Sequence, residues 1–256
     1  MKKCLLLIVV AVLSMLPASA QFTYGTTGLL HAPSADMQQD RTVMIGGGYL
    51  NSHATPSRWN YNTWNYYLNV TFFPWLEIGY TCTVFDEWAR GGKVYMKNQD
   101  RSFHGRVRLW KEGWWKSWTP QIVAGVNDVT TGSGEDYTDM AVSGDGNGFL
   151  NRYYLAATKH IDFYGKWGIH AAYVYNKRGK DKLNGPSWGV DYTFVLPETS
   201  MVNSLVNGIT MIMEYDSEHV NIGGKYSIWK DHINVVGELR ECKYPSVGVY
   251  FKIHLK

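Results

Sequence analysis

The sequence has little cysteine, little excess charge and, after its first residues, no apolar run long enough for a membrane helix. Only three of its 256 residues are cysteines, too few for a disulfide scaffold. A net charge of +3 gives no basis for binding nucleic acid. Because a helical anchor needs about 20 consecutive apolar residues, any residence of the mature chain in a membrane must come from strands.

The first 20 residues have the pattern of a secretory signal peptide. Lys2 and Lys3 precede an apolar stretch from Leu5 to Leu16, and the small residues Ala18 and Ala20 mark a cleavage site ahead of Gln21. We therefore predict that residues 1–20 are removed and that the mature protein lies in the bacterial outer membrane. Two cysteines remain, Cys82 and Cys242, and the sequence leaves open whether they pair in that oxidising environment.

The stretch from Gly208 to Lys256 alternates between apolar and polar residues almost without interruption. Ile209, Met211 and Met213 share one face, whereas Thr210 and Glu214 lie on the other. Successive side chains of a β-strand point to opposite faces, so this period of two predicts strands. One face of each strand is apolar and the other carries charge.

The same periodicity predicts twelve strands over residues 41–256. They are expected at 42–50, 65–73, 75–85, 103–111, 119–128, 149–160, 165–176, 187–195, 208–216, 218–228, 232–240 and 245–255. Bacterial outer-membrane barrels have an even number of antiparallel strands, long outer loops and short periplasmic turns. The sequence therefore predicts an all-β protein, an antiparallel transmembrane β-barrel of about twelve strands.

Aromatic residues support a barrel in a membrane. The chain holds 11 Trp and 18 Tyr, and many of them flank the predicted inner turns, as Trp75, Trp114, Trp115, Trp118 and Trp229 do. Trp and Tyr concentrate at the lipid–water boundary. The alternative, a soluble sandwich, fits less well, because strands with one charged face leave few residues to fill a shared core.

The polar face of the predicted strands points into the barrel. Its ionisable residues are expected to be Glu77, Arg106, Arg108, Lys166, His170, Asp191, Glu214, Asp216, His219, Lys225, Glu238 and Arg240. Both signs of charge occur in similar number. Such groups either pair with one another and fill the interior, or line a narrow aqueous path, and the sequence leaves both arrangements open.

Residues 21–40 show no alternation and contain a distinctive motif. It runs GLLHAPSADM from Gly28 to Met37 and is followed by Asp40. This motif resembles the N-terminal signature of the YjbH-like family of outer-membrane proteins, which is associated with exopolysaccharide and capsule production. The matching residues are Gly28, Leu29, Pro33, Ser34, Ala35, Met37 and Asp40. We expect residues 21–40 to form a plug in the periplasmic mouth or a docking surface against it.

The resemblance implies a non-enzymatic role in export or assembly of an exopolysaccharide or capsule, with the barrel as conduit or scaffold. A closed structural or adhesive barrel that binds ligands through its loops is the alternative, and a lipid-modifying or proteolytic barrel is a third. The expected partners are outer-membrane lipid and lipopolysaccharide, with polysaccharide and periplasmic proteins of the same pathway as further candidates. No nucleic acid is expected.

Catalytic and metal-binding motifs give no strong signal. No serine lies in a Gly-x-Ser-x-Gly elbow, so we predict no catalytic residue and no enzyme activity. The segment 128–148 carries five carboxylates, Asp128, Glu135, Asp136, Asp139 and Asp145, but their spacing matches no calcium loop. The basic segment 177–182 is expected to be a solvated loop or a contact for anionic groups. No metal and no cofactor is expected.

Overall fold

Twelve antiparallel strands form a closed barrel, confirming the fold predicted from the sequence. The structure is a computed structural model that describes residues 20–21, 23–55, 62–84, 99–128, 150–176, 183–229 and 231–255. Within these ranges, no helix combines the length and the apolar character needed to cross a membrane. The predicted signal peptide and the acidic and basic loops fall almost entirely outside the described residues.

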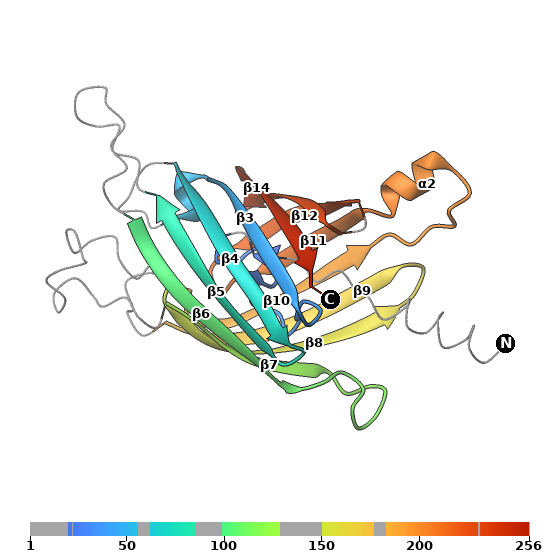
Figure 1. Cartoon of the computed structure of the whole chain (residues 1–256), viewed down its shortest axis with the longest axis horizontal. Coiled ribbons are helices and arrows are strands. Elements are labelled where there is room, and N and C mark those ends of the chain that lie inside the picture. Colours follow the sequence, from blue (N-terminus) through green and yellow to red (C-terminus); the bar gives the residue numbers. More distant parts are fainter. Residues whose placement is uncertain are drawn as a thin grey trace, which may run out of the picture.

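Each barrel strand pairs with its neighbours in the chain, and the last strand closes the barrel against the first, Val247 lying opposite Tyr49 and His254 opposite Thr42 (Figure 1). The strands are β3 (Thr42–Leu50), β4 (Thr63–Phe73), β5 (Leu76–Val84), β6 (Gln99–Trp110), β7 (Gln121–Asn127), β8 (Arg152–Asp162), β9 (Lys166–Tyr175), β10 (Gly185–Thr193), β11 (Ile209–Tyr215), β12 (Val220–Ile228), β13 (Ile233–Arg240) and β14 (Tyr244–His254).

Four short elements escaped the sequence prediction. β1 (Ala20–Gln21) and β2 (Thr26–Thr27) form a two-stranded sheet of their own, too short to produce a detectable alternation. The 3-10 turn η1 (Ser52–Ala54) follows β3. The helix α2 (Met201–Val206) lies in the connection between β10 and β11, where the Ser200 side chain accepts a hydrogen bond from the N–H of Asn203 and caps it.

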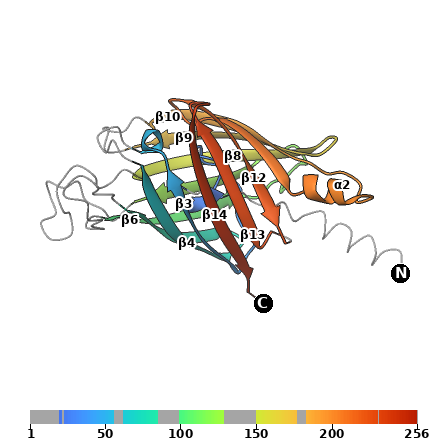
Figure 2. The ribbon, with the colours of Figure 1, turned by 90° about the horizontal axis from the view of Figure 1, so that it is seen from above.

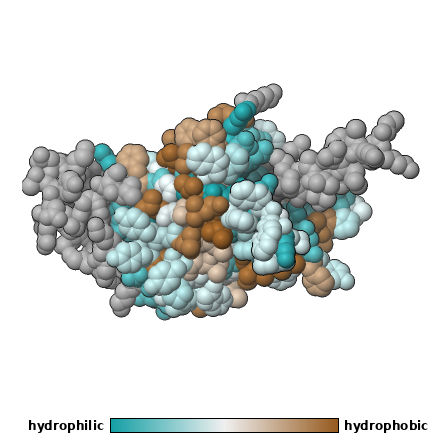
Figure 3. Space-filling view, turned by 90° about the horizontal axis from the view of Figure 1, so that it is seen from below, coloured by the Kyte–Doolittle hydropathy of each residue, from teal (hydrophilic) through white to brown (hydrophobic). Residues whose placement is uncertain are grey.

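The outer surface of the barrel is an apolar band. Leu68, Ile78, Leu155 and Phe251 all point outward and are between 43 and 53 % exposed. Figure 3 shows brown, apolar residues across the middle of one face, with paler residues on both sides. Aromatic side chains lie near the strand ends. We call the end of the barrel where the chain enters β3 and leaves β14 the inner end; Trp114 lies there, and Trp188 lies at the opposite, outer end.

The interior of the barrel is filled by the chain that precedes β3. This lumen segment, residues 23–38, is enclosed by the strands in two perpendicular views (Figure 1, Figure 2), and every residue in it except Asp36 is buried. An eight-stranded barrel is just wide enough for side chains to fill it. Twelve strands enclose more space, and the lumen segment occupies that space.

The two cysteines of the predicted mature chain, both within the described residues, form no disulfide. Cys82 alternates with the outward-facing residues of β5, as expected, yet it is fully buried, with Tyr66 and Tyr80 as interacting neighbours. Cys242 is exposed in the turn between β13 and β14. The fold therefore does not depend on a disulfide between them.

Gly25 allows a test of how tightly the lumen segment is packed. Its φ is +67°, and an added Cβ would lie 2.6 Å from the Tyr67 Cβ. Gly113 has a similar φ of +69° but nothing within 4 Å. Because the backbone cost of about 1–2 kcal/mol is shared, the variant Gly25→Ala should lose about 1–3 kcal/mol more unfolding free energy than Gly113→Ala, owing to overpacking.

Urea unfolding of the two refolded variants measures this difference, and limited proteolysis shows whether cleavage appears within residues 23–38 of Gly25→Ala alone. Equal stability and equal protection of the two variants would contradict the packing described here.

Candidate functional site

The contacts between the lumen segment and the barrel wall form the candidate functional site. The central one involves the carboxylate of Glu214 on β11, which accepts hydrogen bonds from the backbone N–H groups of Leu30, His31 and Ala32 at 2.9, 2.7 and 3.0 Å. Asn221 of β12 donates a fourth hydrogen bond at 3.0 Å. Glu214 is fully buried, so these donors replace the water that a buried carboxylate has lost.

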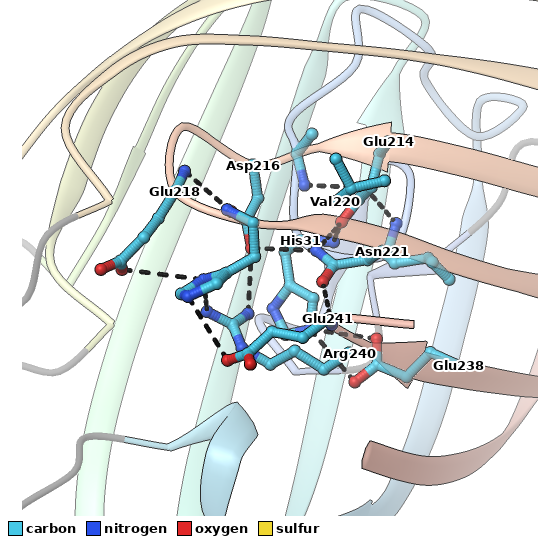
Figure 4. A network of polar contacts seen from close by, with 12 residues as sticks. His31, Glu214, Asp216, Glu218, Val220, Asn221, Glu238, Arg240 and Glu241 are labelled. Atoms are coloured by element: carbon cyan, nitrogen blue, oxygen red, sulfur yellow. Dashed lines mark hydrogen bonds and ion pairs between the residues drawn. The ribbon is translucent and has the colours of Figure 1, made fainter. Parts of the chain in front are cut away.

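A network of ionisable side chains continues from Glu214 toward the outer rim (Figure 4). His31 Nε2 lies 3.0 Å from a carboxylate oxygen of Glu238. Arg240 pairs with Asp216 at 3.0 Å. Burial opposes ionisation of Asp216, but the Arg240 guanidinium and hydrogen bonds from the His219 backbone and the Asn221 side chain hold the pKa of Asp216 below its usual value.

A second buried carboxylate, Glu77 on β5, holds the beginning of the lumen segment. The N–H and hydroxyl of Thr27 donate to it at 2.9 and 2.7 Å, and Asn69 donates at 2.8 Å. Arg106 of β6 lies 3.4 Å from Glu77 and also donates to the carbonyl oxygen of Ser34. The wall and the segment thus share one charge-paired cluster.

Arg152 at the start of β8 binds the segment from a third side. Its guanidinium donates to the carbonyl oxygen of His31 at 2.7 Å and to Gln21 Oε1 at 2.6 Å. The guanidinium carbon lies 3.4 Å from the centroid of the Tyr24 ring, a cation–π contact. Glu214 and Arg152 therefore both bind the backbone at His31, whereas Glu77 binds it at Thr27.

Apolar contacts complete the fit. Leu29 and Leu30 are 2 % and 0 % exposed and lie against the wall where Gly189 and Gly223 leave room for them. A Cβ added at Gly189 would be 2.5 Å from Leu29 Cδ1, and one at Gly223 would be 3.0 Å from Leu30 Cδ1. The two leucines thus fill notches that any larger wall residue would close.

At the inner end, Asp36 joins the segment to β7, β8 and β9. Gln121 donates to Asp36 at 2.6 Å, and His160 Nε2 lies 3.4 Å from it. The other nitrogen of His160 lies 2.7 Å from Glu112. Burial alone would raise the pKa of Glu112, but hydrogen bonds from His160 and Lys159 lower it to about 2.

The structure gathers most of the motif residues around these contacts. Gly28 forms a bridge with Pro33, which closes the backbone turn that presents three N–H groups to Glu214. Ser34 and Ala35 are fully buried, and the Ala35 N–H donates to Thr158 at 2.8 Å. Met37 is nearly buried in an apolar cluster with Val123, whereas Asp40 is exposed ahead of β3.

Ten of the twelve lumen-facing candidates lie on barrel strands, whereas Asp216 and His219 lie in the turn between β11 and β12. Buried ones are Glu77, Arg106, His170, Glu214, Asp216, Lys225, Glu238 and Arg240. Arg108, Lys166, Asp191 and His219 are partly exposed. The structure brings together His170 and Asp191, 2.6 Å apart. Among the candidates, Glu77, Arg106, Glu214 and Glu238 hydrogen-bond to the lumen segment, and His170 Nδ1 lies 3.8 Å from its Asp36.

Several residues of the site were missed from the sequence. Arg152 and Thr158 lie on the same face of β8 as Tyr154 and Ala156. The period of two within the predicted strand 149–160 was the signal that could have identified them. Glu112 could not be identified from strand periodicity, because it lies in the turn between β6 and β7, from which its side chain contacts His160. Among the described residues, no group of three His, Cys, Asp or Glu side chains is arranged to hold a metal ion.

Comparison with known proteins places this geometry in a family context. Residues 20–175 match the model of the YjbH family, whose description is exopolysaccharide biosynthesis protein YbjH. The match contains the lumen segment and the strands β3 to β9. No curated protein matches the chain.

The Glu214 contact predicts how firmly the lumen segment is held. In Glu214→Gln the three backbone N–H groups lose a charged acceptor, and hydrogen bonds to charged groups contribute about 1.5–3 kcal/mol each. We expect local opening of the segment to become easier by about 3 kcal/mol, which is about 100-fold faster amide exchange at Leu30, His31 and Ala32.

Hydrogen exchange with mass spectrometry measures this, and Glu198→Gln serves as the control, because Glu198 is exposed in the connection before α2. Unchanged exchange in Glu214→Gln, or the same acceleration in Glu198→Gln, would contradict the assignment.

Glu112 predicts a specific dependence on pH. Its folded pKa of about 2 lies below the usual 4.5, so its ionised form stabilises the fold above about pH 4.5, and this stability is lost as the pH falls toward 2. The variant Glu112→Gln should therefore be about 2 kcal/mol less stable than the wild type at pH 5, with little difference at pH 2. Urea unfolding at the two pH values checks this, and a difference that persists unchanged at pH 2 would count against it.

Proposed function

Because the chain belongs to the YjbH family of exopolysaccharide biosynthesis proteins, we propose that it is a non-enzymatic outer-membrane barrel that serves the export or assembly of an exopolysaccharide as a scaffold. The single observation that carries the choice of a scaffold is the occupied lumen. The segment 23–38 is held inside the barrel by hydrogen bonds to wall residues on at least seven strands, β4, β5, β6, β7, β8, β11 and β13.

The proposed place in the outer membrane rests on the outer surface of the barrel. Large apolar side chains point outward along the described barrel strands other than β7, and several of them are about half exposed. A contiguous apolar surface of this kind is unfavourable in water and marks a contact with lipid or with another protein. The even number of antiparallel strands and the aromatic side chains near both rims support lipid.

A scaffold fits the interior better than an open conduit. Buried charges must be paired or hydrogen-bonded, and in this barrel Glu214 and Glu77 obtain donors from the segment itself. Withdrawal of the segment would leave both carboxylates without these donors. The closed arrangement is therefore the stable one, and the surfaces left to meet partners are the loops and the inner rim.

Conductance in planar bilayers tests the choice between scaffold and conduit. We expect the refolded wild-type protein to show no steady open-channel current, whereas a variant lacking residues 23–36 conducts, because its lumen is emptied. The variant Glu77→Gln/Glu214→Gln should open intermittently, and Glu198→Gln should behave as the wild type does. A steady current through the wild type that carries sugars would replace the scaffold by a conduit.

The family role needs a separate test. Cells that lack the protein should secrete less exopolysaccharide, and the wild-type chain should restore the amount. Secretion that is unchanged by loss of the protein would contradict the proposed role whatever the bilayer shows.

A further inference from the structure

The turn between β6 and β7, residues 111–120, carries an unusual set of exposed side chains. Trp114, Trp115 and Trp118 are 68, 67 and 64 % exposed, and Lys111 and Lys116 are exposed beside them. In Figure 1 this turn is the green loop that projects past the ends of β6 and β7. It lies at the inner end of the barrel, where the chain enters β3 and leaves β14.

The turn is rigidly built. The Trp114 N–H donates to the Lys111 carbonyl oxygen at 3.2 Å, and the Gly113 N–H donates to Thr119 at 3.1 Å. Lys159 of β8 reaches over and donates to the carbonyl oxygen of Ser117 at 2.6 Å. The exposed rings are therefore held outward by a fixed backbone, with little conformational entropy left to lose on binding.

The exposed surface of the turn is positively charged, owing to Lys111 and Lys116. Its one acidic residue, Glu112, binds Lys159 and the His160 ring, each at 2.7 Å. Neither Lys111 nor Lys116 has a carboxylate partner within the described residues. The Lys116 ammonium instead lies 4.8 Å from the centroid of the Trp115 ring.

We propose that this turn binds the headgroup of an anionic phospholipid in the inner leaflet, with the phosphate between Lys111 and Lys116 and the three tryptophan rings at the level of the glycerol backbone. The inference rests on the proposed membrane location. Indole rings favour the lipid–water boundary, and lysines near an anionic surface bind it electrostatically. The exposed apolar band of the barrel, with Leu109 and Val107 on β6, leads directly into the turn.

The neighbouring inner turns lack this combination among the residues that the structure describes. The Pro74–Trp75 turn holds no charge. Asp162 and Lys166 lie opposite each other across the turn between β8 and β9. Asp231 in the turn after β12 pairs with Lys252 at 2.7 Å. Among these inner turns, and counting described residues alone, the turn 111–120 is the one that combines unpaired lysines with exposed indoles.

The test uses the full chain refolded in a nonionic detergent and titrated with dioctanoyl phosphatidylglycerol or dioctanoyl phosphatidylcholine, with binding followed by native mass spectrometry. We expect the wild type to bind the anionic lipid about 10–30-fold more tightly, because each lysine contributes about fivefold. Lys111→Gln/Lys116→Gln should bring the ratio of the two affinities close to one. Trp115→Ala/Trp118→Ala should lower the affinity for both lipids by the same factor and leave the ratio of the two affinities unchanged.

Lys243→Gln is the matched control, because Lys243 lies 5.0 Å from the ring of Tyr244 on the opposite rim. It should leave the ratio as in the wild type. Equal affinity of the wild type for both lipids, or the same loss in Lys243→Gln as in the double lysine variant, would overturn the proposal and leave the turn as a candidate surface for a protein. Heat-dependent gel migration confirms that each variant has folded. Failure of the wild type to enter vesicles of either lipid would instead contradict the membrane location.

Discussion

A carboxylate enclosed in a barrel must be supplied with hydrogen-bond donors, and at Glu214 the backbone of Leu30, His31 and Ala32 supplies three. These donors come from a turn of the chain that has no strand partner for them, so the wall and the segment satisfy each other. Without the segment the wall would hold an unmatched buried charge. Without the wall the turn would hold three unpaired N–H groups.

The same reciprocity recurs along the lumen. Arg106 and Arg152 donate to carbonyl oxygens of Ser34 and His31, whereas Glu77 accepts from Thr27. In these contacts the cationic wall residues bind backbone carbonyl groups and the anionic ones bind backbone N–H groups. Side chains of the segment add further contacts, such as those of Thr27 with Glu77 and of His31 with Glu238. Leu29 and Leu30 fill the notches at Gly189 and Gly223, so the fit of the segment in the lumen also depends on the shape of these two side chains.

Strand count, strand positions and inward faces could be read from the sequence, because a period of two is a local property and one side of each strand is apolar. The inward positions of Glu214 and Glu77 followed from it. Their partners could not be predicted, since Leu30 and Glu214 are separated by 184 positions in the chain and no local pattern joins them. The motif GLLHAPSADM marked the segment as distinctive but did not show that its N–H groups would meet a carboxylate.

The closure of the barrel between β3 and β14 gives the lumen segment a fixed topology. Residues 36–42 lead directly from the lumen into the inner end of β3, so the segment is tethered to the first strand of the closing seam. Residue 30 contacts β11, the ninth barrel strand, so the full set of native contacts of the segment requires a wall that is nearly whole. Pairing between segments so far apart in the chain is slow to form. Because the segment is joined to the start of β3, at the inner end of the closed barrel, any exit of the segment from the lumen would be toward that end.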